Sequence, residues 1–145
     1  MEFIFCRKNS TEVKNLLDKM SSQFNPSLAS TLDIDEYATK LARNAKFLLC
    51  IYDGDVVGCI IFYTNISTSI LYLPIVWVDS NYRGQAIAKK MFQAIIPYGK
   101  TRDINCIDLE VLKNNEIAYN LYKSLGFINI ENRGSKILMR YYLTD

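Results

Sequence analysis

The segment from Leu109 to Phe127 limits the fold more than any other part of the chain. It consists of a short apolar run, a polar turn, a stretch with helical spacing, and a Gly-Phe pair that leads into a further apolar run. This succession predicts a strand, a helix and another strand. Since each helical residue turns the chain by about 100°, one face of the helix holds Asn115, Ala118, Tyr119 and Tyr122, and the apolar stripe beside it holds Ile117, Leu121 and Leu125.

Length and composition place the chain among ordinary globular proteins. Its 145 residues are 50% hydrophobic and 22% charged, which predicts a single domain over residues 1–145. The net charge of +2 is spread along the chain without a basic stripe, so nucleic acid is not an expected partner. No apolar run is long enough to cross a membrane, and a membrane partner is not expected either.

The cysteines, and the lack of histidine, bear on metals and on compartment. Cys6, Cys50, Cys59 and Cys106 have no CxxC spacing, and the sequence has no histidine. No metal site is therefore expected. Three of the four cysteines lie in apolar runs, where a free thiol packs as a small hydrophobe. With no basic signal-like start, the sequence predicts a reduced, cytoplasmic protein.

The remaining periodicities predict a mixed α/β chain with the element order β-αα-βββ-α-β-α-ββ and helices on both faces of the sheet. Asp53-Gly54 indicates a tight hairpin, and Pro74 is expected to break the strand that contains it. Residues 21–31 are expected to form a loop. The predicted strands are 2–6, 47–52, 56–63, 70–78, 104–111, 127–130 and 136–143, and the predicted helices are 11–20, 33–45, 84–98 and 115–125.

The passage from Val78 to Ala88 predicts a strand that runs into an anion-binding helix start. The first turn of a helix has free N–H groups and a partial positive charge, which suit phosphate. Arg83 adds a fixed positive charge, and the small residues Gly84, Ala86 and Ala88 allow close approach to the backbone. Neither the P-loop nor the dinucleotide fingerprint is present. Small residues at a helix start are also common on structural grounds alone.

These two segments together resemble the GNAT superfamily of acetyl-CoA-dependent N-acetyltransferases. The family pattern V-x-P-x-Y-R-G-x-G-I-G is matched by Val78, Tyr82, Arg83, Gly84 and Ile87, and the pattern N-x-x-A-x-x-L-Y-x-x-x-G-F by Asn115, Ala118, Leu121, Tyr122, Gly126 and Phe127. The resemblance implies a GNAT-like, mostly antiparallel central sheet. It also implies transfer of an acetyl group from acetyl-CoA, as co-substrate, to a primary amine by direct attack in a ternary complex.

The resemblance further implies which residues form the site. Tyr122 would protonate the departing thiolate, and the backbone near Val78 would polarise the thioester carbonyl. Ala86 stands where the family usually has glycine, so binding is expected to be retained but weakened. The carboxylate of Asp79 would oppose a pyrophosphate unless it caps the helix or turns away. The cofactor-binding residues implied are Trp77, Val78, Arg83, Gly84, Gln85, Ala86, Ile87, Ala88, Asn115 and Tyr122.

Each catalytic assignment has a structural alternative. Tyr122 borders an apolar stripe and could serve only in packing. Glu110 shares a strand face with Asp108 and could accept the amine proton through water, but a solvent-facing or salt-bridged carboxylate explains it equally. A water chain is a further candidate for the base.

The acceptor is sought between Gln23 and Tyr37, which include the segment Phe24-Asn25-Pro26 and the acidic residues Asp33, Asp35 and Glu36. These acids could attract an amine, or they could cap a helix. An amino-sugar nucleotide, a peptide N-terminus, a polyamine and a small drug all stay open as acceptors. So do a homodimer, a catalytically silent acyl-CoA-binding or sensing domain, and a plain interaction module.

Overall fold

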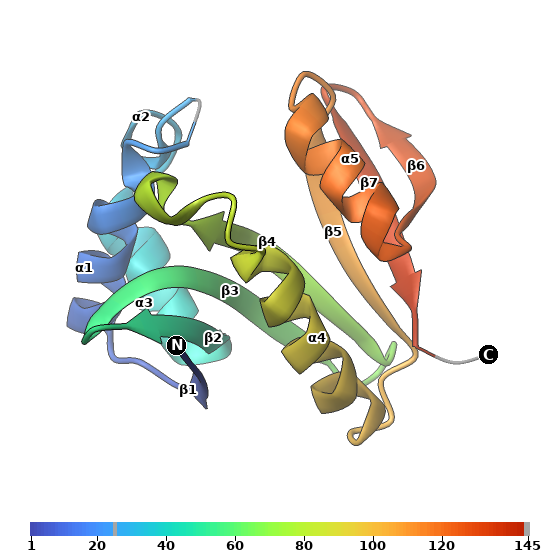
Figure 1. The fold of residues 1–145 in the computed structure, drawn as a ribbon, viewed down its shortest axis with the longest axis horizontal. Coiled ribbons are helices and arrows are strands. Elements are labelled where there is room, and N and C mark those ends of the chain that lie inside the picture. Colours follow the sequence, from blue (N-terminus) through green and yellow to red (C-terminus); the bar gives the residue numbers. More distant parts are fainter. Residues whose placement is uncertain (25, 144–145) are drawn as a thin grey trace. The chain divides into compact units, whose positions relative to one another are not determined.

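The computed structural model describes residues 1–24 and 26–143, which form two compact units. The first unit holds residues 1–61 and 75–91, and the second holds residues 62–74 and the chain from Phe92 onward. Figure 1 labels the elements. In chain order they are β1 (Glu2–Cys6), α1 (Ser10–Ser21), α2 (Leu28–Thr31), α3 (Ile34–Asn44), β2 (Lys46–Tyr52), β3 (Asp55–Asn65), β4 (Ile70–Val78), η1 (Ser80–Tyr82), α4 (Ile87–Lys100), β5 (Cys106–Leu112), α5 (Glu116–Leu125), β6 (Ile128–Arg133) and β7 (Lys136–Tyr142).

The strands form one seven-stranded sheet in the order β1-β2-β3-β4-β5-β7-β6. β1 pairs with β2 antiparallel, β5 pairs with β7 antiparallel, and β6 pairs with β7 antiparallel. β4 and β5 are parallel neighbours. The prediction of a mixed, mostly antiparallel sheet flanked by helices is therefore confirmed.

In the first unit, a reciprocal pair of hydrogen bonds caps the start of α1. The Asn9 side chain accepts from the Glu12 N–H at 2.9 Å, and the Glu12 carboxylate accepts from the Asn9 N–H at 3.1 Å. This reciprocal pair satisfies two N–H groups at the start of α1. α1 packs against α3. The apolar side chains of α1 that face inward, Val13, Leu16, Leu17 and Met20, are buried.

The loop predicted for residues 21–31 contains a short helix, α2. Ser27 precedes it in extended conformation, and the Ser21 hydroxyl accepts from the Ala29 N–H at 2.9 Å. A hydrogen bond from the Leu32 N–H to the Leu28 carbonyl, 2.9 Å, closes the turn. Four residues are too few to produce a clear helical period, so the sequence did not indicate this element.

The hairpin between β2 and β3 turns at Asp53-Gly54, as predicted. Both residues have positive φ, 51° and 79°, which a two-residue turn of this kind requires. β3 is buried continuously from Val57 to Phe62. A Cβ on Gly58 would lie 3.0 Å from Cγ2 of Ile87. The glycine therefore allows the first turn of α4 to pack closely on β3.

Two predictions about the elements are wrong, the break of a strand at Pro74 and the start of a helix at residue 84, and the backbone conformation explains both. β4 runs unbroken through Pro74, with buried and half-buried residues alternating along it. Proline fits extended backbone and removes only a single donor. The helix expected from residue 84 begins instead at Ile87, because Gly84 and Ala86 have φ of 84° and 58°, which a right-handed helix excludes.

In the second unit, α5 lies against β5 (Figure 1). It ends at Gly126, whose φ of 109° suits a glycine C-cap. Phe92 and Phe127 pack edge to face, with ring centroids 5.5 Å apart. Ile117 was expected in the apolar stripe of α5, but its side chain is 87% exposed. It lies in the first turn of the helix, and the buried side of α5 is formed around Tyr122 instead.

Candidate functional site

The turn after β4 is organised by Asp79. Its N–H donates to the Val57 carbonyl at 2.8 Å, and its carboxylate accepts from the Asn81 N–H at 3.0 Å. The residue is buried. Its carboxylate therefore caps the short turn η1, and not α4, the helix whose start was predicted to bind phosphate.

A concave run of backbone donors follows at the start of α4. Ala86, in the left-handed φ region, immediately precedes the right-handed helix, and such a junction turns successive N–H groups toward one side. Within the described part of the chain, the N–H groups of residues 86–89 have no hydrogen-bond acceptor, and the first helical bond is from Lys90 to the Ala86 carbonyl. These donors can bind an anion.

The charges around this helix start are positive. Arg83, Lys89 and Lys90 are exposed, and the first turn of α4 contains no acidic residue. Arg83 makes a contact of 3.5 Å from Nε to the Val78 carbonyl, at the limit of a hydrogen bond. Its guanidinium is thus weakly held, and the donors fit the charge of a pyrophosphate.

Trp77 was predicted to bind the cofactor, but its side chain lies in the core. It is 3% exposed, and its indole N–H donates to Gln23 Oε1 at 3.1 Å. The same Gln23 oxygen accepts from the Ser80 N–H at 2.9 Å. Gln23, which sequence reasoning considered only for the acceptor, therefore ties the end of α1 to the end of β4. Because the Trp77 side chain is buried, a cofactor could contact this residue only through its backbone atoms.

In the second unit, Asn115 is the N-cap of α5 and not its first residue. Its side-chain oxygen accepts from the Ala118 N–H at 3.2 Å. Tyr119, on the same helix face, donates its hydroxyl to Asn129 at 3.1 Å. Of the polar groups predicted on this face, the oxygen of Asn115 and the hydroxyl of Tyr119 both have protein partners.

Tyr122 is a packed residue with an accessible hydroxyl. It is 8% exposed, and its ring lies 6.0 Å from that of Phe92 and 5.8 Å from that of Phe127, centroid to centroid. Among the described residues, the Tyr63 hydroxyl is the one side-chain polar atom that is both inaccessible to solvent and without a hydrogen-bond partner. The Tyr122 hydroxyl has no protein partner either, so it must reach solvent. Burial raises the pKa of Tyr122 to about 12.

The two acids of β5 have different surroundings. Arg140 holds the buried Asp108 with two hydrogen bonds, of 2.7 and 2.9 Å. Glu110, whose side chain is 23% exposed, accepts from the Tyr72 hydroxyl at 3.1 Å and lies 3.4 Å from Arg133. The salt-bridged form of Glu110 that the sequence left open is thus present. Tyr72 was missed, because its contact depends on the register between β4 and β5.

The acidic residues near the proposed acceptor region serve local structure. Asp33 caps α3 by accepting from the Glu36 N–H at 3.1 Å, and Asp35 pairs with Lys14 at 2.9 Å. Capping and ion pairing therefore account for Asp33 and Asp35. Asn25, in the middle of the segment 24–26, lies outside the described residues.

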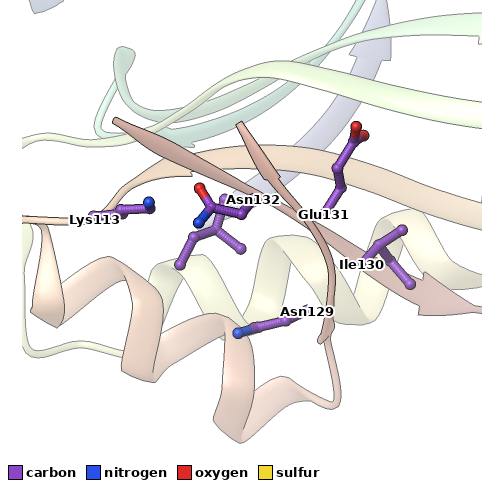
Figure 2. A pocket seen from close by; sticks show the side chains of 6 residues that line it. Lys113, Asn129, Ile130, Glu131 and Asn132 are labelled. Carbon is purple, nitrogen blue, oxygen red and sulfur yellow. The ribbon is translucent and has the colours of Figure 1, made fainter. Parts of the chain in front are cut away.

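A shallow hollow of about 250 Å³ lies on the hairpin of β6 and β7. Figure 2 shows the ammonium end of Lys113 pointing toward Asn132. None of the residues that the sequence assigned to the site lines this hollow. The lining residues are Lys113, Asn129, Ile130, Glu131, Asn132 and Ile137.

The described ranges, residues 1–24 and 26–143, also bear on membranes and metals. No helix there is long and apolar enough to cross a membrane. No group of three or more His, Cys, Asp or Glu side chains is placed there to hold a metal ion.

Two solved structures of similar fold are named as N-acetyltransferases. A paia N-acetyltransferase from Thermoplasma acidophilum, in complex with coenzyme A, has a TM-score of 0.77 at 15% identity and is covered over 99% of its chain by 98% of this one. The ribosomal-protein-S18-alanine N-acetyltransferase from Escherichia coli has a TM-score of 0.77 at 17% identity, over 99% of this chain and 96% of that one. These similarities establish the fold.

Curated relatives match part of the chain. N-acetylaspartate synthetase from Xenopus tropicalis is 31% identical over 68% of this chain and 36% of its own length. N-alpha-acetyltransferase 30 from Saccharomyces cerevisiae is 33% identical over 61% of this chain and 49% of its own length. The chain thus spans between a third and a half of these relatives. The model of the acetyltransferase (GNAT) family matches residues 12–127, and the chain belongs to that family.

Proposed function

We propose that this chain is an acetyl-CoA-dependent N-acetyltransferase that acetylates a primary amine by direct attack in a ternary complex. The observation that carries the proposal is the row of unpaired N–H groups at residues 86–89, next to the weakly held Arg83. Donors without protein acceptors, in positive surroundings, fit the pyrophosphate of coenzyme A. Membership of the acetyltransferase (GNAT) family supports the same cofactor.

The residues are assigned by the group that each would contact. The backbone of residues 83–88 would hold the pyrophosphate, and Trp77 and Val78 would offer backbone to the pantetheine arm. The N–H groups of Asp79 and Ser80 are already bonded, and the polarising donor for the thioester carbonyl would be the backbone N–H near Val78. Asn115 would contact the cofactor through its Nδ2 amide, since its oxygen caps α5.

Bound acetyl-CoA would supply an activated acyl thioester. As the new C–N bond forms and the C–S bond breaks, Glu110 takes the proton that the amine loses, through a water molecule, and Tyr122 gives its proton to the departing sulfur. Each proton thus has a donor and an acceptor, and Tyr122 is restored by exchange with solvent at its accessible hydroxyl.

The raised pKa of Tyr122 limits how it can act. A phenol with a pKa of about 12 is a weaker acid than a thiol, whose pKa is about 8.5, by roughly 5 kcal/mol. Free proton transfer to a finished thiolate would therefore be uphill. The acid role requires transfer that accompanies C–S cleavage, with the hydroxyl already in hydrogen-bond reach of the sulfur.

The names of the relatives guide the choice of acceptor. One relative is named an N-alpha-acetyltransferase, and one structural neighbour is named for an alanine of a ribosomal protein. We therefore place the α-amino group of a peptide first among the acceptors, with an amino-sugar nucleotide as the small-molecule alternative. The four free cysteines support a reducing compartment such as the cytoplasm, and sedimentation velocity would distinguish a monomer from a homodimer.

An amine screen read out by release of the CoA thiol tests the proposal. Peptides with free N-termini, amino-sugar nucleotides and polyamines are each offered with acetyl-CoA, and at least one is expected to release thiol. Tyr122→Phe should lower that rate at least tenfold and leave acetyl-CoA affinity within about twofold. Binding of acetyl-CoA without transfer to any amine would favour a silent sensing domain, and no binding would favour an interaction module.

A further inference from the structure

The carboxylate of Glu110 is held from two sides. The hydroxyl of Tyr72, on β4, donates to Oε1 at 3.1 Å. Nη1 of Arg133, at the end of β6, lies 3.4 Å from Oε2. All three residues belong to the second unit. Each oxygen of the carboxylate therefore has one partner, and the two partners come from different strands.

The β4–β5 register brings Tyr72 to Glu110. Tyr72 lies opposite Asp108, and Glu110 follows Asp108 by two residues, on the same face of β5. Diagonal neighbours of this kind are within reach of a long aromatic side chain. The Tyr72 hydroxyl does not donate to Asp108, the residue opposite it in the register, whose two carboxylate oxygens are bonded to Arg140. It donates to Glu110, whose side chain is more exposed.

The two ion pairs on this face differ in how far their side chains are exposed and in their length. The Asp108 and Arg140 side chains are 7% and 23% exposed, and their atoms approach to 2.7 Å. The Glu110 and Arg133 side chains are 23% and 43% exposed, and their pair is 3.4 Å long. Arg133 also has Glu131 as a partner at 2.9 Å. Arg133 can therefore leave Glu110 and still keep an ion pair.

Tyr72 acts on Glu110 as a donor and not as a base. Burial, and then the negative charge of Glu110, raise the pKa of Tyr72 to about 12. The phenol therefore keeps its proton throughout the neutral range and can donate it in the hydrogen bond to Glu110. The other titratable or charged groups around Glu110 are Asp108 on β5, Glu131 and Arg133 on β6, and Arg140 on β7.

Resting on the proposed acetyl transfer, we propose that Tyr72 is a positioning residue. Its hydroxyl holds Glu110 in one orientation, so that the carboxylate can take the proton from the attacking amine while Arg133 moves aside to Glu131.

Steady-state kinetics of Tyr72→Phe, with the best amine from the screen, test this role. The variant keeps the ring and loses the hydroxyl. We expect kcat to fall about tenfold and the KM for acetyl-CoA to stay within twofold. In a Glu110→Gln background, Tyr72→Phe should cost nothing further.

Tyr119→Phe is the matched control. It removes a tyrosine hydroxyl whose hydrogen bond is also 3.1 Å long. This hydroxyl does not contact Glu110, so kcat should stay unchanged. Thermal melts confirm that each variant folds. An unchanged kcat in Tyr72→Phe, an equal loss in the Glu110→Gln background, or a fully active Glu110→Gln would overturn the role of Tyr72 and leave the proposed function intact. A folded wild type that transfers to no amine would overturn both.

Discussion

The guanidinium of Arg140 binds both carboxylate oxygens of Asp108, at 2.7 and 2.9 Å, across neighbouring strands. The hydrogen bond and charge of Asp108 raise the pKa of Arg140 further above its usual range. A bidentate pair around a buried carboxylate leaves little freedom to either side chain. We interpret it as a structural link between β5 and β7.

Asp108→Asn should therefore destabilise the protein by about 2–4 kcal/mol, because it leaves the partly buried charge of Arg140 without its partner. Urea unfolding at pH 7 measures this change. Asp35→Asn is the control, since the Asp35–Lys14 pair is 2.9 Å long but largely exposed, and its loss should cost no more than about 1 kcal/mol. Equal losses in the two variants would contradict the structural role of Asp108.

Ala86→Gly should stabilise the protein by about 0.5–1 kcal/mol. Alanine at a φ of 58° has a steric cost that glycine does not have, and this gain exceeds the extra entropy that glycine brings to the unfolded chain. Denaturant unfolding checks the sign. Ala88→Gly lies inside α4 and should destabilise instead. A loss of stability in Ala86→Gly would show that the left-handed conformation is not occupied in solution.

Gly58→Ala should disturb the donors at the start of α4. Its new methyl group would lie 3.0 Å from Cγ2 of Ile87, so the first turn must shift. We expect about 1–2 kcal/mol of destabilisation and weaker acetyl-CoA binding. Adding Ile87→Leu removes the β-branch that clashes and should restore part of both. If the double variant shows no recovery in either unfolding or calorimetry, the close packing of β3 and α4 is not what positions the donors.

Stability should fall at alkaline pH as buried tyrosines ionise. The folded-state pKa of Tyr122, about 12, is above the usual value of about 10. Its contribution is therefore fully present below pH 10 and is lost as the pH rises from 10 to 12. Tyr122→Phe should remove about 2–3 kcal/mol of that pH dependence, measured by unfolding at pH 8 to 12. An unchanged slope would mean that the ring is not buried as described.

Local signals predicted much of this fold. Asp53-Gly54 acts through its own neighbours, so the hairpin between β2 and β3 could be predicted from the sequence. The positive φ of Ala86 could not be predicted, because alanine does not favour that conformation and only its surroundings impose it. The contact between Tyr72 and Glu110 was hidden for another reason. It joins residues 38 positions apart, and single-sequence patterns do not give the register of parallel strands.

The central claim is that backbone donors at residues 86–89 and Arg83 bind the pyrophosphate of acetyl-CoA. Calorimetric titration of the wild-type chain and of Arg83→Gln with coenzyme A and, separately, with pantetheine tests it most directly, since pantetheine lacks the pyrophosphate together with the 3′-phosphoadenosine attached to it. We predict that the wild type binds coenzyme A at least about a hundredfold more tightly than pantetheine, equivalent to about 2.7 kcal/mol of binding free energy. Arg83→Gln should make this difference in affinity smaller. Equal affinity for the two ligands, or no binding of coenzyme A, would contradict it.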